Sequence, residues 1–176
     1  MKRRGTRHSE LGLMVEEDRT EIRLAQEEDA EQIASCLTLA FEAFRSQYTS
    51  GAFKDTVLSP EAVRERLGSM NVYVAVAGET MVVGTLAAAA CGEEGHLRGM
   101  AVCPEWQGRG LAEQLLTRAE SDLKAAGCRC VTLDTTVPLQ RATRFYGRNG
   151  FVRSGKVVDF FGMPLHEFVK QLGSEE

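Results

Sequence analysis

GMAVCPEWQGRGLA, from Gly99 to Ala112, decides the fold of this chain, because it turns a hydrophobic strand directly into a glycine-rich helix start. Gly108 and Gly110 keep the backbone free of side-chain bulk, so several N–H groups can converge on one anion at the positive end of the following helix. The stretch therefore predicts a phosphate-binding loop, and the segments around it indicate the fold that holds the loop.

Three strands are expected on the N-terminal side of the loop. The strand-like runs Asn71–Ala77, Thr80–Ala90 and His96–Val102 are separated by Gly78-Glu79 and by Gly92–Gly95. Short glycine-containing connections between such runs are typical of hairpins. The three strands should therefore form an antiparallel meander.

The segment after the loop predicts a crossover. From Gly110 to Ala126 the apolar residues recur on one helical face, and Cys130–Thr135 is the next strand-like run. A strand, a helix and a strand within ~40 residues form a βαβ unit, which places the two strands parallel to each other. The sheet should therefore be mixed.

The remaining segments complete the sheet and its covering helices. We expect a strand at Glu21–Ala25, an amphipathic helix at Glu28–Phe44, a looser aromatic segment at Tyr48–Val57, a short helix from Ser59-Pro60-Glu61 to Gly68, a helix at Gln140–Asn149, and a closing hairpin of Phe151–Phe160 and Met163–Val169. The predicted fold class is α/β, of the α+β type, with a mixed, mostly antiparallel sheet of about six to seven strands and about four helices.

Composition predicts one globular domain. The chain has 176 residues, of which 43% are hydrophobic and 26% charged, and its formal net charge is −4. We expect the domain at 21–172, between a disordered N-terminal tail at 1–20 and a C-terminal tail at 173–176. The basic residues of the first tail are Lys2, Arg3, Arg4 and Arg7. The overall negative charge nevertheless argues against nucleic acid as a partner.

A cytoplasmic protein without a membrane span or metal is expected. The longest apolar run, Met81–Cys91, is interrupted by Gly84 and Thr85 and is shorter than the ~20 residues that cross a bilayer. The five cysteines show no Cys-x-x-Cys spacing, so neither a disulfide framework nor a zinc site is predicted.

Two common nucleotide-binding motifs do not fit the loop. A dinucleotide-binding Gly-x-Gly-x-x-Gly beginning at Gly108 would need glycine where Glu113 stands, and it would open the first βαβ unit of the chain rather than follow a meander. The Gly-Lys-Ser/Thr of a nucleoside-triphosphate loop is absent.

The run Gln107-Gly108-Arg109-Gly110-Leu111-Ala112 matches the Gln/Arg-x-x-Gly-x-Gly/Ala signature of the GNAT acetyltransferase superfamily. Ala142-x-x-x-Tyr146 followed by Gly150-Phe151 also resembles that family's A-x-x-x-Y…G-F segment, and the order of elements from 21 to 172 follows its pattern. The resemblance covers all but the N-terminal ~20 residues.

The resemblance implies acetyl-CoA as co-substrate and transfer of its acetyl group to an amine. Backbone N–H groups of Gln107, Gly108, Arg109, Gly110, Leu111 and Ala112 would hold the pyrophosphate, with the side chains of Gln107 and Arg109 as further donors. In the family, the pantetheine arm lies where the preceding strand splays from its central parallel neighbour, here at Met100, Ala101 and Val102. Gly99 is consistent with a bulge there, or with an ordinary sheet irregularity.

The same resemblance proposes groups that move protons. Tyr146 stands where family members often place a tyrosine that protonates the departing thiolate, although it could instead only pack the helix on the sheet. Many members place an acidic base on the strand before the loop, a position that holds His96 here, and imidazole suits that role. Glu94, Asp134 or solvent are the alternatives.

Two features leave parts of the site open. Leu139 replaces an asparagine often found three residues before Ala142, which puts one pantetheine contact in doubt. Three arginines near the same helix could meet a CoA phosphate or form a solvated cationic face: Arg141, Arg144, Arg148.

In the family, the acceptor pocket is shaped by the first two helices and the last hairpin. Here these segments are aromatic, and the predicted substrate residues are Phe41, Phe44, Tyr48, Asp159 and Phe160, with Phe53 and Phe161 nearby. Phe41 and Phe44 could instead belong to the core. Glu42, Asp55 and Asp159 are predicted to attract an ammonium group.

The first functional hypothesis is an acetyl-CoA-dependent N-acetyltransferase acting on a small-molecule or peptide amine. The alternative is a CoA-binding sensor or interaction module of the same fold without significant turnover. No nucleic-acid or membrane partner is expected, and a homodimer is possible.

Overall fold

Seven strands form one mixed sheet in the computed structural model, which describes residues 19–173. The N-terminal basic cluster and most of the predicted tails lie outside these described residues. The strands are β1 (Thr20–Leu24), β2 (Asn71–Ala77), β3 (Met81–Cys91), β4 (Glu94–Val102), β5 (Cys130–Thr136), β6 (Val152–Phe160) and β7 (Met163–Gln171). Their order across the sheet is β1-β2-β3-β4-β5-β7-β6.

The described residues also form five α-helices. They are α2 (Ala30–Phe41), α3 (Ser50–Thr56), α4 (Pro60–Leu67), α5 (Leu111–Ala125) and α6 (Gln140–Arg148). Three 3-10 segments accompany them: η1 (Glu27–Asp29), η2 (Glu42–Gln47) and η3 (Pro104–Trp106). The predicted mixed sheet with its flanking helices is confirmed.

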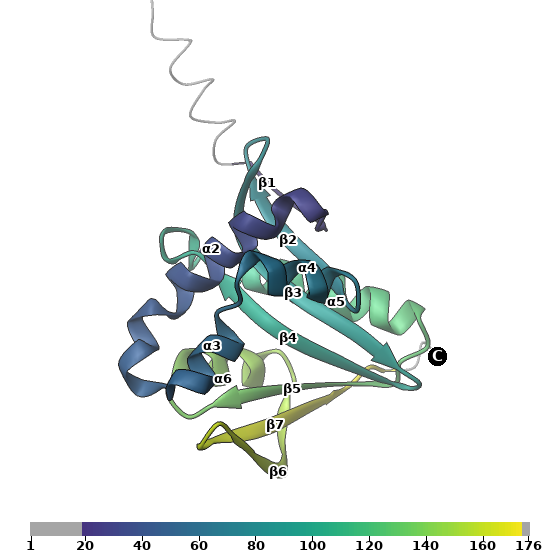
Figure 1. Cartoon of the computed structure of the whole chain (residues 1–176). Helices are drawn as coiled ribbons and strands as arrows, with labels where there is room; N and C mark the ends of the chain where they lie inside the picture. The colour runs from purple at the N-terminus through teal and green to yellow at the C-terminus, as the bar shows by residue number, and fades with distance from the viewer. Residues whose placement is uncertain (1–18, 174–176) are drawn as a thin grey trace, which may run out of the picture.

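The meander and the crossover lie where the sequence predicts them. β2, β3 and β4 pair antiparallel in succession, and β4 pairs parallel with β5. That parallel pairing runs only from Glu94–Cys130 to Leu97–Leu133, although both strands continue beyond it. β4 and β5 therefore splay apart at their C-terminal ends, as Figure 1 shows.

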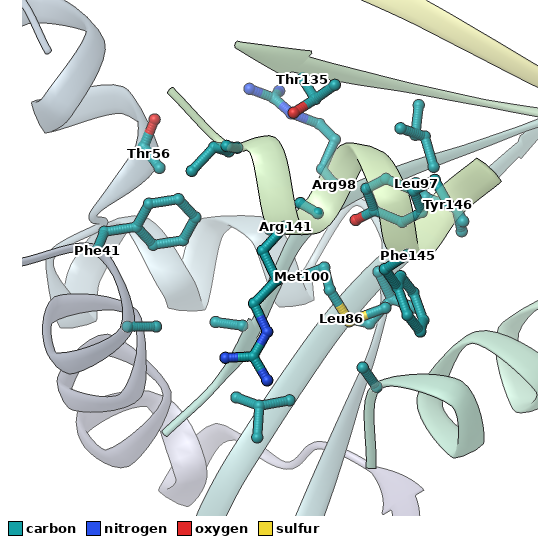
Figure 2. Close-up of a pocket in the computed structure, with 18 of the residues that line it drawn as sticks. Phe41, Thr56, Leu86, Leu97, Arg98, Met100, Thr135, Arg141, Phe145 and Tyr146 are labelled. Carbon is teal, nitrogen blue, oxygen red and sulfur yellow. The ribbon is translucent and has the colours of Figure 1, made fainter. Parts of the chain in front are cut away.

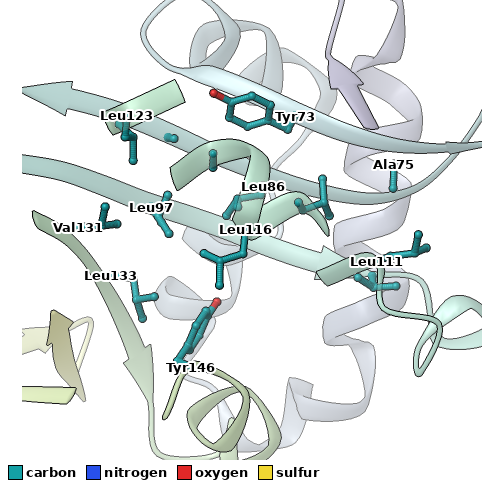
Figure 3. Packing of buried hydrophobic residues seen from close by; sticks show 14 of the residues in the cluster. Tyr73, Ala75, Leu86, Leu97, Leu111, Leu116, Leu123, Val131, Leu133 and Tyr146 are labelled. Carbon is teal, nitrogen blue, oxygen red and sulfur yellow. The ribbon is translucent and has the colours of Figure 1, made fainter. Parts of the chain in front are cut away.

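Helices cover both faces of the sheet. α2 and α4 pack on one face, where a core cluster contains Ile33, Leu37 and Val63. α5 and α6 lie on the other face, where Leu115, Leu116 and Tyr146 join the apolar side chains of the strands (Figures 1 and 3). The gap between β4 and β5 therefore has α2 and α4 on one side and α5 and α6 on the other.

Two predicted segments differ from the structure. The aromatic segment expected to be irregular contains α3, whose N-cap Thr49 accepts a hydrogen bond from the backbone N–H of Ala52 at 3.3 Å. The helix predicted to run to Phe44 changes to η2 after Phe41. Hydrophobic periodicity continues through both kinds of helix and therefore does not mark where the α-helix ends.

Candidate functional site

The splayed gap opens into a cavity of about 830 Å³. Residues of β4 and β5 form its centre, while α5 and α6 contribute one side and α2, η2, α3 and α4 the other. We name the side formed by 106–113 and α6 the donor side, and the side formed by α2 to α4 with the β6–β7 hairpin the acceptor side. Figure 2 shows Phe41 and Tyr146 facing this space from opposite sides.

The glycine-rich loop has the backbone that its sequence predicts. Gly108 and Gly110 have φ of 77° and 78°, which side-chain-bearing residues rarely adopt. Gly110 is the N-cap of α5 and supplies no side-chain cap, so the amides of the first turn are available to an anion. The loop borders the cavity on the donor side.

Eight of the nine predicted cofactor residues line the cavity: Met100, Ala101, Val102, Gln107, Gly108, Gly110, Leu111, Ala112. Arg109 does not line it, and its guanidinium lies 4.5 Å from the centroid of the Trp106 ring. The Gln107 amide, predicted as a donor to the pyrophosphate, donates to the carbonyl of Val102 at 3.0 Å and accepts from Arg141 at 2.9 Å. Gln107 therefore ties the loop to β4 and α6.

Gly99 forms a β-bulge. Its φ is 64°, and the pairing between β3 and β4 shifts register at this point, from Thr85–Ala101 to Ala87–Arg98. The predicted bulge is confirmed. Because pairing with β5 has already ended at Leu97, the backbone from Arg98 to Val102 borders the open gap.

Tyr146 reaches the cavity from α6. The residue is 7% exposed, and its ring packs edge-on against Phe145 and Phe151. Burial raises the pKa of the phenol, so the hydroxyl stays protonated near neutral pH. Figure 2 shows this hydroxyl directed toward the middle of the cavity, where it can donate a proton or a hydrogen bond.

A polar chain joins three of the residues that were considered as bases. Thr132 donates its hydroxyl hydrogen to Glu94 at 3.0 Å, and its oxygen lies 2.9 Å from Nδ1 of His96. We assign the Thr132 hydroxyl hydrogen to the Glu94 carboxylate, and on that assignment the Thr132 oxygen accepts from an Nδ1–H group of His96. Nε2 is then the unprotonated nitrogen, and it lies 3.7 Å from Asp134. His96 and Asp134 line the cavity, whereas Glu94 does not.

The environment keeps this histidine uncharged. Burial lowers the pKa of His96, and the Asp134 carboxylate only partly offsets that effect. Burial also raises the pKa of Asp134. Neutral His96 with a free Nε2 can accept a proton at pH 7.

Aromatic residues from the predicted acceptor segments line the other side. Phe41, Phe44, Tyr48 and Phe160 border the cavity. Their mutual ring contacts place Phe41 against both Phe44 and Tyr48, with centroids 6.4 Å apart in each pair. The Tyr48 hydroxyl lies 2.6 Å from Oγ1 of Thr136, which attaches this wall to β5.

The acidic residues predicted beside the acceptor already have protein partners. Asp159 is outside the cavity lining and accepts from the backbone of Gly162 at 3.3 Å, within the hairpin turn. Glu42 pairs with Arg45 at 2.9 Å. Asp55 lines the cavity but pairs with Arg98 at 3.1 Å.

The comparisons with known proteins agree with this architecture. A family model described as the acetyltransferase (GNAT) family matches residues 30–151, most of the chain. The chain belongs to the GNAT family. Its glycine loop, bulged strand and Tyr146 lie within the matched region.

Two curated relatives of this GNAT chain are an N-alpha-acetyltransferase and an aminoglycoside acetyltransferase. N-alpha-acetyltransferase MAK3 of Arabidopsis thaliana is 34% identical over 67 residues, which cover 38% of this chain and 35% of that protein. Aminoglycoside N(6')-acetyltransferase type 1 of Stenotrophomonas maltophilia is 37% identical over 71 residues, which cover 40% and 46%. The chain thus matches about a third to a half of the length of these relatives.

A solved GNAT structure covers far more of the chain. The PaiA N-acetyltransferase of Thermoplasma acidophilum in complex with coenzyme A superimposes with a TM-score of 0.73 at 20% identity, covering 88% of this chain and 99% of that one. At this identity the likeness shows a shared fold.

Arg66, Arg98 and Thr135 are among the cavity residues that were not singled out from the sequence. Arg66 lies in the last turn of α4 beside other charged residues, so its sequence context is typical of a solvated helix terminus. Arg98 could have been found from its alternation with His96 on one strand. Thr135 is 4% exposed, and its hydroxyl has no hydrogen-bond partner in the described part of the chain.

Within residues 19–173, no group of three or more His, Cys, Asp or Glu side chains is arranged to hold a metal ion. The same residues include no helix with the length and apolar character needed to cross a bilayer.

Proposed function

We propose that this protein is an acetyl-CoA-dependent N-acetyltransferase that transfers the acetyl group directly from the thioester to a primary amine. The observation that carries the proposal is one cavity in the splayed gap that joins the glycine loop, the bulged backbone at Gly99 and the Tyr146 hydroxyl. Such an arrangement provides an anion site, a strand edge and a proton donor in one space.

The donor side fits the chemistry of acetyl-CoA. Uncapped amides at the start of α5 suit a pyrophosphate, because they supply N–H donors at the positive end of a helix. The unpaired backbone from Met100 to Val102 suits the amide groups of a pantetheine arm, which can pair with it as an added strand. When bound, acetyl-CoA supplies the acetyl group as a thioester.

Tyr146 serves as the general acid in this proposal. The phenol carries its proton at neutral pH and lines the cavity, where it can donate that proton or a hydrogen bond as negative charge develops on the leaving sulfur. The two rings beside it make the surroundings of the phenol less polar, which strengthens a hydrogen bond to the departing thiolate.

His96 serves as the base that removes the ammonium proton. Its Nδ1–H is held by Thr132, and its Nε2 is left to accept a proton on the cavity side. Asp134 stabilises the imidazolium formed in that step. Glu94 is joined to His96 through Thr132, and its charge also favours the protonated imidazole.

A primary amine is the acceptor class that we propose, in a small molecule or a peptide. The names of the two curated relatives refer to acetylation of an alpha-amine and of an aminoglycoside, both amines. Cytoplasmic location and possible dimerisation stay predictions from the sequence.

The proposal is tested by incubating the protein with acetyl-CoA and a panel of amines while free thiol release is followed. Amine-dependent release of CoA is expected, together with a rise in melting temperature when acetyl-CoA alone is added. A thermal shift without any turnover would favour the CoA-binding module instead. Absence of both effects would exclude either function.

A further inference from the structure

Two arginines and one carboxylate lie on the acceptor side of the cavity. Arg98 pairs with Asp55 at 3.1 Å. Arg66, from the last turn of α4, lines the same space, and no side-chain hydrogen bond or ion pair within 4 Å joins it to any described residue. This part of the cavity therefore has an excess positive charge.

Arg66 lies directly over the bulge of β4. A Cβ atom added to Gly99 would come within 2.6 Å of Nη1 of Arg66, so the absence of a side chain at 99 makes room for the guanidinium. Burial lowers the pKa of Arg66 to about 10, and the neighbouring Arg98 cation contributes to that shift. The group is still charged at pH 7, at a place where desolvation makes a missing counter-ion unfavourable.

The neighbouring groups suit an amine. His96 and Arg98 alternate with Leu97 along β4, so their side chains leave the same face of the strand. Next to His96 lies Asp134, whose carboxylate is 3.7 Å from Nε2. One end of this face therefore carries a base and an acid, His96 and Asp134, and the other end carries the two guanidinium groups.

We propose that the acceptor is a free amino acid with an apolar side chain, whose carboxylate binds between Arg66 and Arg98 while its amino group faces His96 and Asp134. This inference rests on the proposed acetyltransferase function. The apolar side chain would contact the wall that includes Phe41, Phe44 and Phe160. Guanidinium groups suit a carboxylate because they present paired N–H donors.

The reaction leaves the carboxylate unchanged. The amino nitrogen forms a bond with the carbonyl carbon of the thioester, and the carbon–sulfur bond breaks. Nε2 of His96 first takes one proton from the ammonium group and passes it to solvent. The departing sulfur takes the proton of Tyr146, and the second proton lost by the nitrogen restores the phenol. The products are an N-acetyl amino acid and CoA, and no oxidant or reductant is required.

The free carboxylate distinguishes this acceptor from a peptide N-terminus and from an aminoglycoside. A peptide N-terminus has an amide where the free amino acid has its carboxylate, and an aminoglycoside carries several positive charges. Neither would neutralise Arg66. The acceptor side should therefore distinguish substrates by the charge of the group attached to the carbon that bears the amine. A neutral group in that place would leave the guanidinium groups without a partner.

The experiment compares leucine, methionine and phenylalanine with their primary amides as acceptors, using wild type, Arg66→Gln and the control Arg64→Gln. Arg64 lies on the same helix but pairs with Glu31 outside the cavity. For wild type, kcat/KM should be at least about tenfold higher for at least one amino acid than for its amide, consistent with a charge-assisted hydrogen-bond pair. Arg66→Gln should remove that preference mainly through KM, and Arg64→Gln should keep it.

A wild type that acetylates the amides as well as the acids would overturn this inference and leave the acetyltransferase function standing. So would an Arg66→Gln variant that loses activity equally toward both. If no amine is acetylated, the proposed acetyltransferase function is wrong. The carboxylate site is then tested by amino acid binding alone. In that case leucine, methionine or phenylalanine must raise the melting temperature of the CoA-saturated wild type, but not of Arg66→Gln, or the site is rejected as well.

Discussion

The donor and acceptor sides of the cavity are built in different ways. The donor side relies on backbone: two glycines with positive φ, the uncapped start of α5 and an unpaired strand edge. The acceptor side relies on side chains from four separate segments, including Phe41, Arg66 and Asp55. A backbone site tolerates change in most side chains of the molecule, whereas a side-chain site can alter its ligand with each substitution. One family fold can thus keep its donor while its acceptor varies.

Among the substitutions that test the two sides, Tyr146→Phe is expected to have the largest effect on kcat, because it removes the proposed acid. We expect kcat to fall about a hundredfold, a common contribution of general acid catalysis, while acetyl-CoA affinity changes little. Steady-state kinetics and calorimetric titration measure the two quantities. Tyr73→Phe is the matched control, since Tyr73 is a buried tyrosine whose hydroxyl donates to Asp122 at 2.9 Å, away from the cavity. Equal losses in the two variants would contradict the role of Tyr146.

His96→Ala tests the proton acceptor at the boundary between the two sides. In wild type, kcat should fall as pH decreases below about 6.5, because the pKa of buried His96 is lowered and its protonated form cannot accept a proton. The variant should lose about tenfold or more in kcat at pH 7 and lack this acid limb. His166→Ala, on β7 outside the cavity lining, should keep the wild-type profile. An unchanged acid limb in His96→Ala would assign the base elsewhere.

Gly108→Ala tests whether loop backbone holds the donor. A side chain at φ 77° costs about 1–2 kcal/mol, so a loop that shifts to relieve this strain should bind acetyl-CoA several-fold to about tenfold more weakly. Gly92→Ala introduces comparable strain at φ 61° in the β3–β4 turn, also with open space around the new Cβ. Both variants should lose similar stability, but only the loop variant should lose affinity in a titration. Equal affinities of the two variants for acetyl-CoA would argue against binding by the loop backbone.

Thr135→Val is the smallest expected change. The Thr135 hydroxyl is buried without a partner, so its removal should raise the free energy of unfolding of the ligand-free protein by about 1 kcal/mol. Thr132→Val should lower that free energy instead, because it breaks the contacts with His96 and Glu94. Denaturant titration measures both. Destabilisation of Thr135→Val would mean that its hydroxyl has a partner in solution.

The difference between a backbone-built side and a side-chain-built side also explains how much could be predicted from the sequence. The loop, the bulge at Gly99 and the parallel pair follow from local rules on glycine and chain connection, so these three structural features could be placed in advance. Arg66 could not, because its significance depends on a bulge more than thirty positions away in the sequence. Asp159 was predicted to attract an ammonium group, but its carboxylate is used by the hairpin turn. Partners of charged side chains depend on tertiary contacts that periodicity does not contain.

The most direct test of the central account is hydrogen–deuterium exchange of the wild type with and without acetyl-CoA. Backbone amides at 99–102 and 108–112 should become protected, because they bond to the bound co-substrate, whereas 41–55 on the acceptor side should change little. Protection confined to 41–55, or none in the glycine loop at saturating acetyl-CoA, would contradict a donor site built from backbone in the gap between β4 and β5.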